Sequence, residues 1–243
     1  MKSLRILFTT LLISCALEAN GAQTDGSFQA TITKQVGLHY RTVTPENYDP
    51  QKKYPLLIFL HGRGEQGDDL DKVQIHGPFK KVAELGLPMI LVAPQSPEDQ
   101  WWEADSLSAL VNHLLETLPV DTSRIYLTGL SMGGYGTWKL AVHRPEVFAA
   151  IAPICGYAPA SQAKVLRDTP VWIFHGAKDK VISVSESTEM ANALYAVGND
   201  ARLTIYPKAE HDSWTETYDN PQLYQWLLSH RKEPQASPLR NEH

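Results

Sequence analysis

Short apolar runs alternate with longer segments of mixed polarity along most of the chain. The clearest run is Pro55–Leu60, which is continuous and typical of a strand buried on both faces of a sheet. Similar runs follow at Met89–Ala93, Ile125–Thr128, Ala150–Ile154, Val171–Phe174 and Leu203–Tyr206. The segments between them have helical character at Phe79–Leu85, Leu107–Leu118, Met132–His143, Ser187–Val197 and Leu223–His230.

This alternation predicts an α/β fold with a mostly parallel central sheet and helices on both faces. Two strand-like stretches, Phe28–Gln35 and Leu38–Thr44, precede the first buried run, with Gly37 between them. They predict an antiparallel hairpin at the N-terminal edge of the sheet. The 243 residues suit one catalytic domain, expected over 28–232, followed by a flexible tail over 233–243.

The first residues have the features of a bacterial export signal, expected over 1–22. Lys2 and Arg5 form a basic start, and Ile6–Ser14 is an apolar run too short to cross a bilayer. Leu12-Ile13-Ser14-Cys15 resembles a lipobox, which would lipidate Cys15 and anchor the protein to a membrane. Ordinary cleavage near Ala19–Ala22 is the alternative. The sequence therefore predicts export to the periplasm, to the exterior or to the envelope as a lipoprotein.

The charge pattern and the cysteines exclude several other classes. The net charge is −5 and the basic residues are scattered, which argues against a nucleic-acid partner. Cys155 has only Cys15 as a conceivable partner, so no disulfide is expected once Cys15 is lipidated or removed. Cys155 lies in a buried-strand sequence and is interpreted as a small core residue.

Gly129-Leu130-Ser131-Met132-Gly133 fits the Gly-x-Ser-x-Gly nucleophile elbow. A predicted strand precedes it and a predicted helix follows it, which is the context that this motif requires. Small residues are needed beside the serine because the backbone approaches itself closely at such a turn. We therefore expect Ser131 to be a catalytic nucleophile.

A serine nucleophile needs a base and an acid that orients the base, and in this context they follow the serine in the order acid, then histidine. Asp179 lies in the loop that follows the Val171–Phe174 strand, and His211 lies in the loop that follows Leu203–Tyr206. Both are predicted at the carboxyl ends of parallel strands, where ligands bind. Asp179 would hold the tautomer of His211.

Other polar residues are weaker candidates for the acid and the base. His175 is interpreted as a loop-packing residue because Gly176 follows it directly at the strand end. Asp212 is adjacent to His211 and cannot easily reach back to its ring. Asp168 precedes its strand and is expected at the wrong end of the sheet.

The oxyanion formed in such a reaction needs two N–H donors. One is predicted to be the backbone N–H of Met132, and the second that of Arg63, in the loop His61-Gly62-Arg63-Gly64. No Gly-Lys-Ser/Thr follows these glycines, so a phosphate loop is not expected. Metal-ligand pairs of the His-x-Glu-His or Cys-x-x-Cys type are absent from the sequence, and no cofactor or metal is predicted.

Three tryptophans follow predicted strands near the expected site and are candidates for substrate binding. Trp101 and Trp102 come after the Met89–Ala93 run, and Trp214 is three residues beyond His211. Exposed indole rings can stack on a sugar or an aromatic acid, although packing of the loops is the alternative.

Taken with the loops that carry Asp179 and His211, the elbow and the His61–Gly64 loop resemble the α/β-hydrolases. More narrowly, the chain resembles exported bacterial esterases described as phospholipase/carboxylesterase-like, poly(hydroxybutyrate)-depolymerase-like or predicted peptidases of the prolyl-oligopeptidase group. The resemblance implies a Ser131, Asp179, His211 triad and cofactor-free hydrolysis of carboxylic esters, with carbohydrate or aromatic-acid esters as candidate substrates. The alternatives are a serine peptidase and a non-catalytic binding module on the same fold.

Overall fold

The computed structural model describes residues 27–29 and 34–232. The expected export signal over 1–22, including Cys15, and the tail over 233–243 lie outside the described residues. Every helix and strand discussed below falls within residues 36–232. Within the described part of the chain, no helix is long and apolar enough to cross a membrane.

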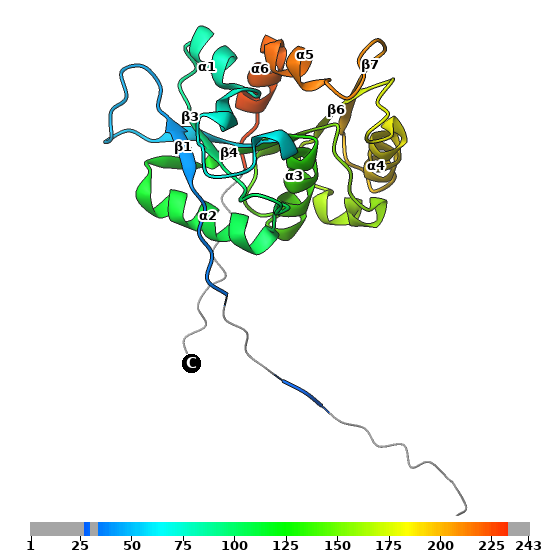
Figure 1. Ribbon diagram of the computed structural model, residues 1–243, viewed down its shortest axis with the longest axis horizontal. Coiled ribbons are helices and arrows are strands. Elements are labelled where there is room, and N and C mark those ends of the chain that lie inside the picture. Colours follow the sequence, from blue (N-terminus) through cyan, green and yellow to red (C-terminus); the bar gives the residue numbers. More distant parts are fainter. Residues whose placement is uncertain (1–26, 30–33, 233–243) are drawn as a thin grey trace, which may run out of the picture. The chain divides into compact units, whose positions relative to one another are not determined.

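Seven strands form one sheet in the order β1-β3-β2-β4-β5-β6-β7 (Figure 1). All neighbouring strands are parallel except β1 and β3. The strands are β1 (Tyr40–Val43), β2 (Tyr54–Leu60), β3 (Ile90–Pro94), β4 (Val120–Leu130), β5 (Ala150–Ile154), β6 (Trp172–Gly176) and β7 (Arg202–Tyr206). The predicted parallel α/β architecture is confirmed.

The antiparallel pairing expected at the N-terminal edge is present, but its geometry differs from a local hairpin. β1 pairs with β3, with Tyr40 opposite Pro94, and residues 34–39 form no strand. Residues 30–33 of the other expected hairpin strand lie outside the described part. Pairing with β1 satisfies backbone groups that β3 would otherwise expose at the edge of the sheet.

Helices cover both faces of the sheet (Figure 1). One face carries α2 (Ala104–Thr117), α3 (Met132–His143) and α4 (Val184–Ala196), together with the 3-10 helix η3 (Ala160–Leu166). The other face carries α1 (Phe79–Glu84), α5 (Trp214–Asp219) and α6 (Pro221–Ser229). Two further 3-10 helices, η1 (Arg63–Glu65) and η2 (Lys72–Gln74), lie in the connection after β2. Helix α5 was not expected from the sequence.

The period of two along the buried strands divides their side chains between the two layers of core. In β2, Leu56, Ile58 and Leu60 pack in the core under α2 and α3. Leu57 and Phe59 point to the opposite face and join the core under α1 and α6. All five are at most 1% exposed, which explains why this strand is apolar without alternation.

Candidate active site

Ser131 occupies a sharp turn between β4, which ends at Leu130, and α3, which begins at Met132. Its backbone has φ 52° and ψ −115°, a conformation that non-glycine residues rarely adopt. A Cβ at Gly133 would lie 1.9 Å from the Leu60 carbonyl oxygen, and one at Gly129 would lie 2.4 Å from the Gly133 oxygen. The two glycines therefore allow the strained turn that lifts Ser131 out of the sheet.

We expect Gly133→Ala to lower the free energy of unfolding by about 3 kcal/mol or more, because the added methyl group meets backbone that cannot move aside. Gly37→Ala is the matched control, since nothing lies within 4 Å of a Cβ at Gly37. Urea denaturation of both variants measures the difference. Equal stability of the two variants would contradict this account of the turn.

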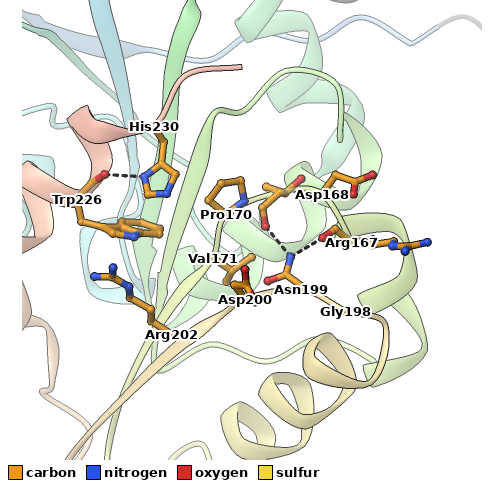
Figure 2. Close-up of a pocket in the computed structure, with 11 residues that line it drawn as sticks. Arg167, Asp168, Pro170, Val171, Gly198, Asn199, Asp200, Arg202, Trp226 and His230 are labelled. Atoms are coloured by element: carbon orange, nitrogen blue, oxygen red, sulfur yellow. Dashed lines mark hydrogen bonds between the residues drawn. The ribbon is translucent and has the colours of Figure 1, made fainter. Parts of the chain in front are cut away.

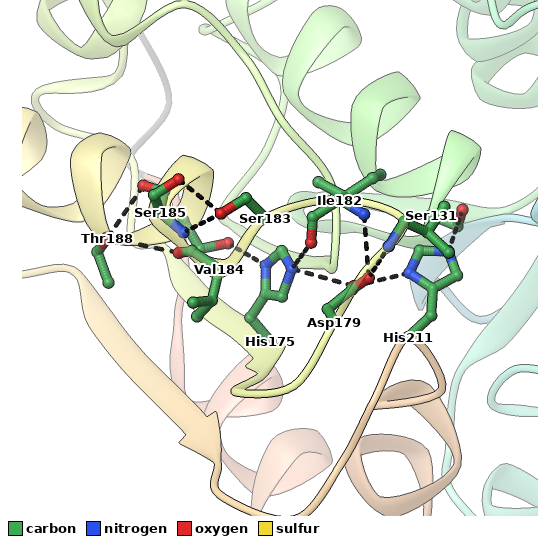
Figure 3. A network of polar contacts seen from close by, with 11 residues as sticks. Ser131, His175, Asp179, Ile182, Ser183, Val184, Ser185, Thr188 and His211 are labelled. Carbon is green, nitrogen blue, oxygen red and sulfur yellow. Dashed lines mark hydrogen bonds and ion pairs between the residues drawn. The ribbon is translucent and has the colours of Figure 1, made fainter.

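Ser131, His211 and Asp179 form a continuous chain of hydrogen bonds (Figure 3). Ser131 Oγ lies 2.9 Å from His211 Nε2. His211 Nδ1 lies 2.7 Å from Asp179 Oδ2. The three residues come from the loops after β4, β7 and β6, at the carboxyl ends of parallel strands. This geometry allows His211 to accept the Ser131 proton while Asp179 accepts a hydrogen bond from the other ring nitrogen.

The Asp179 carboxylate is held by the backbone of its own loop. Its side chain is 0% exposed, and its Oδ1 accepts hydrogen bonds from the Val181 and Ile182 N–H groups at 2.8 and 3.0 Å. Burial alone would raise the pKa of Asp179, but the hydrogen bonds from His211, Ile182 and Val181 outweigh it, so the pKa lies below its usual value. The carboxylate is therefore ionised at neutral pH.

The loop after β2 lies directly against the elbow. A Cβ at Gly133 would contact the carbonyl oxygens of both Leu60 and His61, so the two segments have no space between them. Arg63 and Met132 line the same pocket as Ser131. Their backbone N–H groups are thus the available candidates for stabilising an oxyanion, as proposed from the sequence.

His61, which sequence reasoning left without a role, fixes this loop. The ring is fully buried, and Nε2 accepts the Ser96 N–H at 3.0 Å. Burial lowers the pKa of His61 to about 4, so the ring is neutral and its Nδ1–H donates to the Gly62 carbonyl. The signal available in the sequence was the position of His61 directly after the most apolar strand. The ring ties the loop after β2 to the loop after β3.

The three candidate tryptophans have different surroundings. Trp101 and Trp214 line the pocket at Ser131, which has a volume of about 570 Å³. Trp214 packs edge-on against the His211 ring, with centroids 5.4 Å apart. Trp102 is only 2% exposed and donates its indole N–H to the His61 carbonyl, so it supports the loop and does not face the pocket. For Trp102 the alternative interpretation, packing of the loops, is therefore the correct one.

Tyr135 and Tyr157 were not predicted from the sequence as site residues. With Trp101 they form a row of packed aromatic rings, the aromatic wall. Trp101 packs edge-to-face on Tyr135, with centroids 5.4 Å apart, and Tyr135 packs on Tyr157 at 5.1 Å. Tyr135 lies on α3 and Tyr157 follows β5, so only the fold brings them beside Trp101. Trp101 and Tyr157 line the pocket and are 49% and 36% exposed.

Asp168 lies at the other end of the sheet, as expected. It lines a cavity of about 350 Å³ at the amino ends of β6 and β7 (Figure 2). The Asn199 amide in this cavity donates to the Leu166, Arg167 and Thr169 carbonyls. Asp212 is exposed, and its carboxylate accepts hydrogen bonds from Thr215. Neither residue belongs to the hydrogen-bonded chain at Ser131.

The sequence led us to expect that His175 packs its loop, but its ring also contacts Asp179, the carboxylate of the hydrogen-bonded chain at Ser131. It is fully buried, and its Nε2 lies 3.2 Å from Asp179 Oδ2. Its position next to Gly176 gave no indication of this contact.

Cys155, Asp179 and His211 are the one group of three metal-ligand types that lies close together among residues 27–29 and 34–232, with ligand atoms within 4.8 Å of one another. Burial raises the pKa of the Cys155 thiol to about 12, so it keeps its proton. His211 and Asp179 already use their facing atoms in a hydrogen bond. The three residues are therefore a poor fit to a resident cation.

Comparison with known proteins gives one matching family model and many similar proteins. Residues 94–226 match the dienelactone hydrolase family. The probable feruloyl esterase C of Aspergillus terreus is 28% identical over 204 residues, which cover 79% of this chain and 75% of the relative.

Solved structures with the same fold include esterases and peptidases. A thermostable esterase is 32% identical and superposes with a TM-score of 0.69, covering 79% of this chain and 59% of the esterase chain. The dipeptidyl peptidase 4 of Porphyromonas gingivalis has a TM-score of 0.67 at 16% identity over 79% of this chain. This chain spans only 33% of the peptidase.

Proposed function

The chain belongs to the dienelactone hydrolase family, and on that premise we propose that it is a serine esterase that cleaves carboxylic esters through an acyl-enzyme. The observation that carries the proposal is the hydrogen-bonded chain from Ser131 Oγ through His211 to Asp179, which opens into a pocket. Its esterase relatives support the class of reaction.

The geometry supports the following sequence of steps. Ser131 Oγ attacks the ester carbonyl carbon as His211 Nε2 accepts the serine proton, and the Met132 and Arg63 N–H groups stabilise the oxyanion. The intermediate collapses, the C–O bond to the alcohol breaks, and His211 returns the proton to the departing alcohol. Water then attacks the acyl-enzyme with His211 as base, which releases the acid and restores Ser131.

The aromatic wall favours substrates with a ring. Trp101, Tyr135 and Tyr157 form a row of aromatic contacts beside Ser131, and Val181 is exposed on the rim of the pocket. A half-exposed indole gains contact area and ring stacking when it meets a planar or sugar ring. We therefore propose esters of aromatic acids or of carbohydrates as the substrate class.

We expect Trp101→Ala to raise KM for methyl ferulate by about 5- to 12-fold, which corresponds to loss of one aromatic contact of about 1–1.5 kcal/mol. The effect on p-nitrophenyl acetate should be within twofold. Tyr195→Ala is the matched control, because Tyr195 is also 49% exposed but lies on α4 away from the pocket. An equal change in KM for methyl ferulate and p-nitrophenyl acetate would mean that Trp101 does not recognise the aromatic acid.

A panel of esters and amides tests the proposed function. It contains short and long acyl p-nitrophenyl esters, methyl ferulate, acetylated xylan, a phospholipid and a peptide anilide. Preferential hydrolysis of the esters supports the proposal. Faster turnover of the anilide would favour the serine peptidase, which the peptidase neighbours keep as the second candidate.

We also propose that the protein acts outside the cytoplasm, on the basis of Lys2, Arg5 and the apolar run before Cys15. Mass spectrometry of the mature N-terminus distinguishes a lipidated Cys15 from cleavage near Ala22. An unprocessed Met1 in the native host would contradict export by this signal.

A further inference from the structure

His175 is a second histidine on the acid of the triad. It lies near the end of β6, four residues before Asp179, and both side chains are 0% exposed. Its Nε2 is 3.2 Å from Asp179 Oδ2. This is the same oxygen that His211 Nδ1 reaches at 2.7 Å from the opposite side (Figure 3).

Both ring nitrogens of His175 have a hydrogen-bond partner, and these partners determine the tautomer of the ring. Nε2 lies 3.0 Å from the Ile182 carbonyl oxygen, which can only accept, so Nε2 carries the hydrogen. In the neutral ring Nδ1 is then an acceptor, and the Ser187 hydroxyl donates to it at 2.7 Å. Ser187 is 2% exposed and lies on α4. The ring therefore connects the acid of the triad to a helix of the scaffold.

The Asp179 carboxylate accepts hydrogen bonds from three N–H groups and lies against the ring of His175. Two backbone N–H groups, from Val181 and Ile182, donate to Oδ1. The third comes from His211, whose Nδ1 donates to Oδ2. His175 Nε2 lies 3.2 Å from the same Oδ2, with its hydrogen donated to the Ile182 carbonyl. Because the carboxylate is fully buried, water cannot replace a donor that is lost. The partial positive charge of the His175 N–H group, whose nitrogen lies 3.2 Å from Oδ2, thus offsets part of the negative charge that Oδ2 presents to His211.

Resting on the proposed function, we propose that His175 is a positioning residue of the triad: it fixes the Asp179 carboxylate and moderates how strongly that carboxylate makes His211 basic. His175 touches neither the substrate nor Ser131. It acts through Asp179, which limits both the rotation of the acid and the charge that the acid presents to the base.

Other titratable groups lie near this network. Arg63, Glu65 and His76 line the same pocket as His211 and are retained in every variant below. Cys155, at the end of β5, has a ligand atom within 4.8 Å of those of Asp179 and His211, and its thiol stays protonated because burial raises its pKa to about 12. Asp212 is exposed on the loop of His211 and is present in every variant below. A change of pH profile caused by substitution of His175 is therefore attributable to the Asp179–His211 pair.

The test compares His175→Met with His175→Gln, two side chains of similar length of which only glutamine retains an N–H donor. We expect His175→Met to lower kcat by about 10- to 100-fold, because the acid is no longer held in place. KM should stay within twofold. The acid limb of kcat/KM should move to higher pH, since a carboxylate without the His175 N–H dipole beside Oδ2 stabilises a positive charge on the His211 ring more strongly. His175→Gln should recover most of kcat and return the acid limb toward that of the wild type.

Equal kcat and equal acid limbs for His175→Met and His175→Gln would overturn the inference. It would also be overturned if the loss of kcat in each variant were fully explained by a lower melting temperature. If neither variant folds, Ser187→Ala serves in their place, because it releases the ring without changing it. A shift of the acid limb in the same direction supports the inference, and an unchanged profile overturns it. Ser131→Ala in the same assay separates the two proposals, since activity in that variant would contradict the esterase mechanism itself.

Discussion

Replacement of Ser131 by alanine should reduce kcat for ester hydrolysis by about 10⁴-fold or more, because no other group can form the acyl-enzyme. Alanine also has a Cβ, so it experiences the same backbone conformation at φ 52° as serine does. The variant should therefore fold, with a melting temperature close to that of the wild type. Initial rates on p-nitrophenyl acetate and thermal unfolding of both proteins measure the two quantities.

The residual rate is informative in this experiment. The pocket and the Arg63 and Met132 N–H groups are unchanged in Ser131→Ala, so slow hydrolysis by water above the uncatalysed rate remains compatible with the mechanism. Hydrolysis at the wild-type rate by the folded variant would mean that Ser131 is not the nucleophile.

Asp179→Asn should lower kcat by about 10⁴-fold, an effect nearly as large. The amide oxygen can still accept the two backbone N–H groups that Oδ1 accepts, from Val181 and Ile182. Its NH₂ group would then face His211 Nδ1 as a donor, so the ring is held in the tautomer that places a hydrogen on Nε2. In that form His211 cannot accept the proton of Ser131.

Asp212→Asn is the control for this substitution, because Asp212 is the exposed neighbour of His211 and its carboxylate accepts hydrogen bonds from Thr215. We expect its kcat within threefold of the wild type. A loss in Asp212→Asn as large as that in Asp179→Asn would indicate that removal of any negative charge near His211 suffices, and that the hydrogen bond to Asp179 is not required.

The pH dependence of the wild type follows from the lowered pKa of Asp179. Since the folded pKa lies below the usual value, the carboxylate stabilises the folded protein at neutral pH. That contribution is lost only as the pH falls through the folded pKa. Protonation of Asp179 is therefore not expected to contribute to any loss of kcat/KM near neutrality.

The fold was predictable because its buried strands are continuous apolar runs. Pro55–Leu60 and Ala150–Ile154 were recognised from this pattern, and each lies in the parallel sheet. The α/β-hydrolase assignment is confirmed by the topology and by the esterase neighbours. The narrower groupings named from the sequence, phospholipase-like among them, stay expectations.

The grouping of Ser131, Asp179 and His211 in space was accessible from the sequence because a parallel sheet places the loop after each strand at the same edge. Asp179 and His211 therefore lie beside Ser131, although 48 and 80 residues separate them along the chain from it. Residues whose neighbours come from unrelated elements could not be found in this way. Trp102 adjoins Trp101 in sequence, yet it contacts His61 and is buried.

Tyr135, Tyr157 and His175 show the same limit. Tyr135 has ordinary helical surroundings in sequence, and its contact with Trp101 depends on how α3 packs beside the loop after β3. His175 is the last residue but one of a buried strand, and its contact with Asp179 depends on the turn that the backbone makes after Gly176. Pairings of this kind are set by tertiary geometry, for which the local sequence carries no periodic signal.

Covalent labelling with a fluorophosphonate tests the central claim most directly, because this reagent traps an activated serine and needs no knowledge of the substrate. The mechanism predicts one adduct per molecule, located on the tryptic peptide that contains Ser131, with loss of esterase activity in proportion to labelling. Ser131→Ala should take up no label. An active enzyme that remains unlabelled, or that carries the adduct on another residue, would contradict the assignment of Ser131 as the nucleophile.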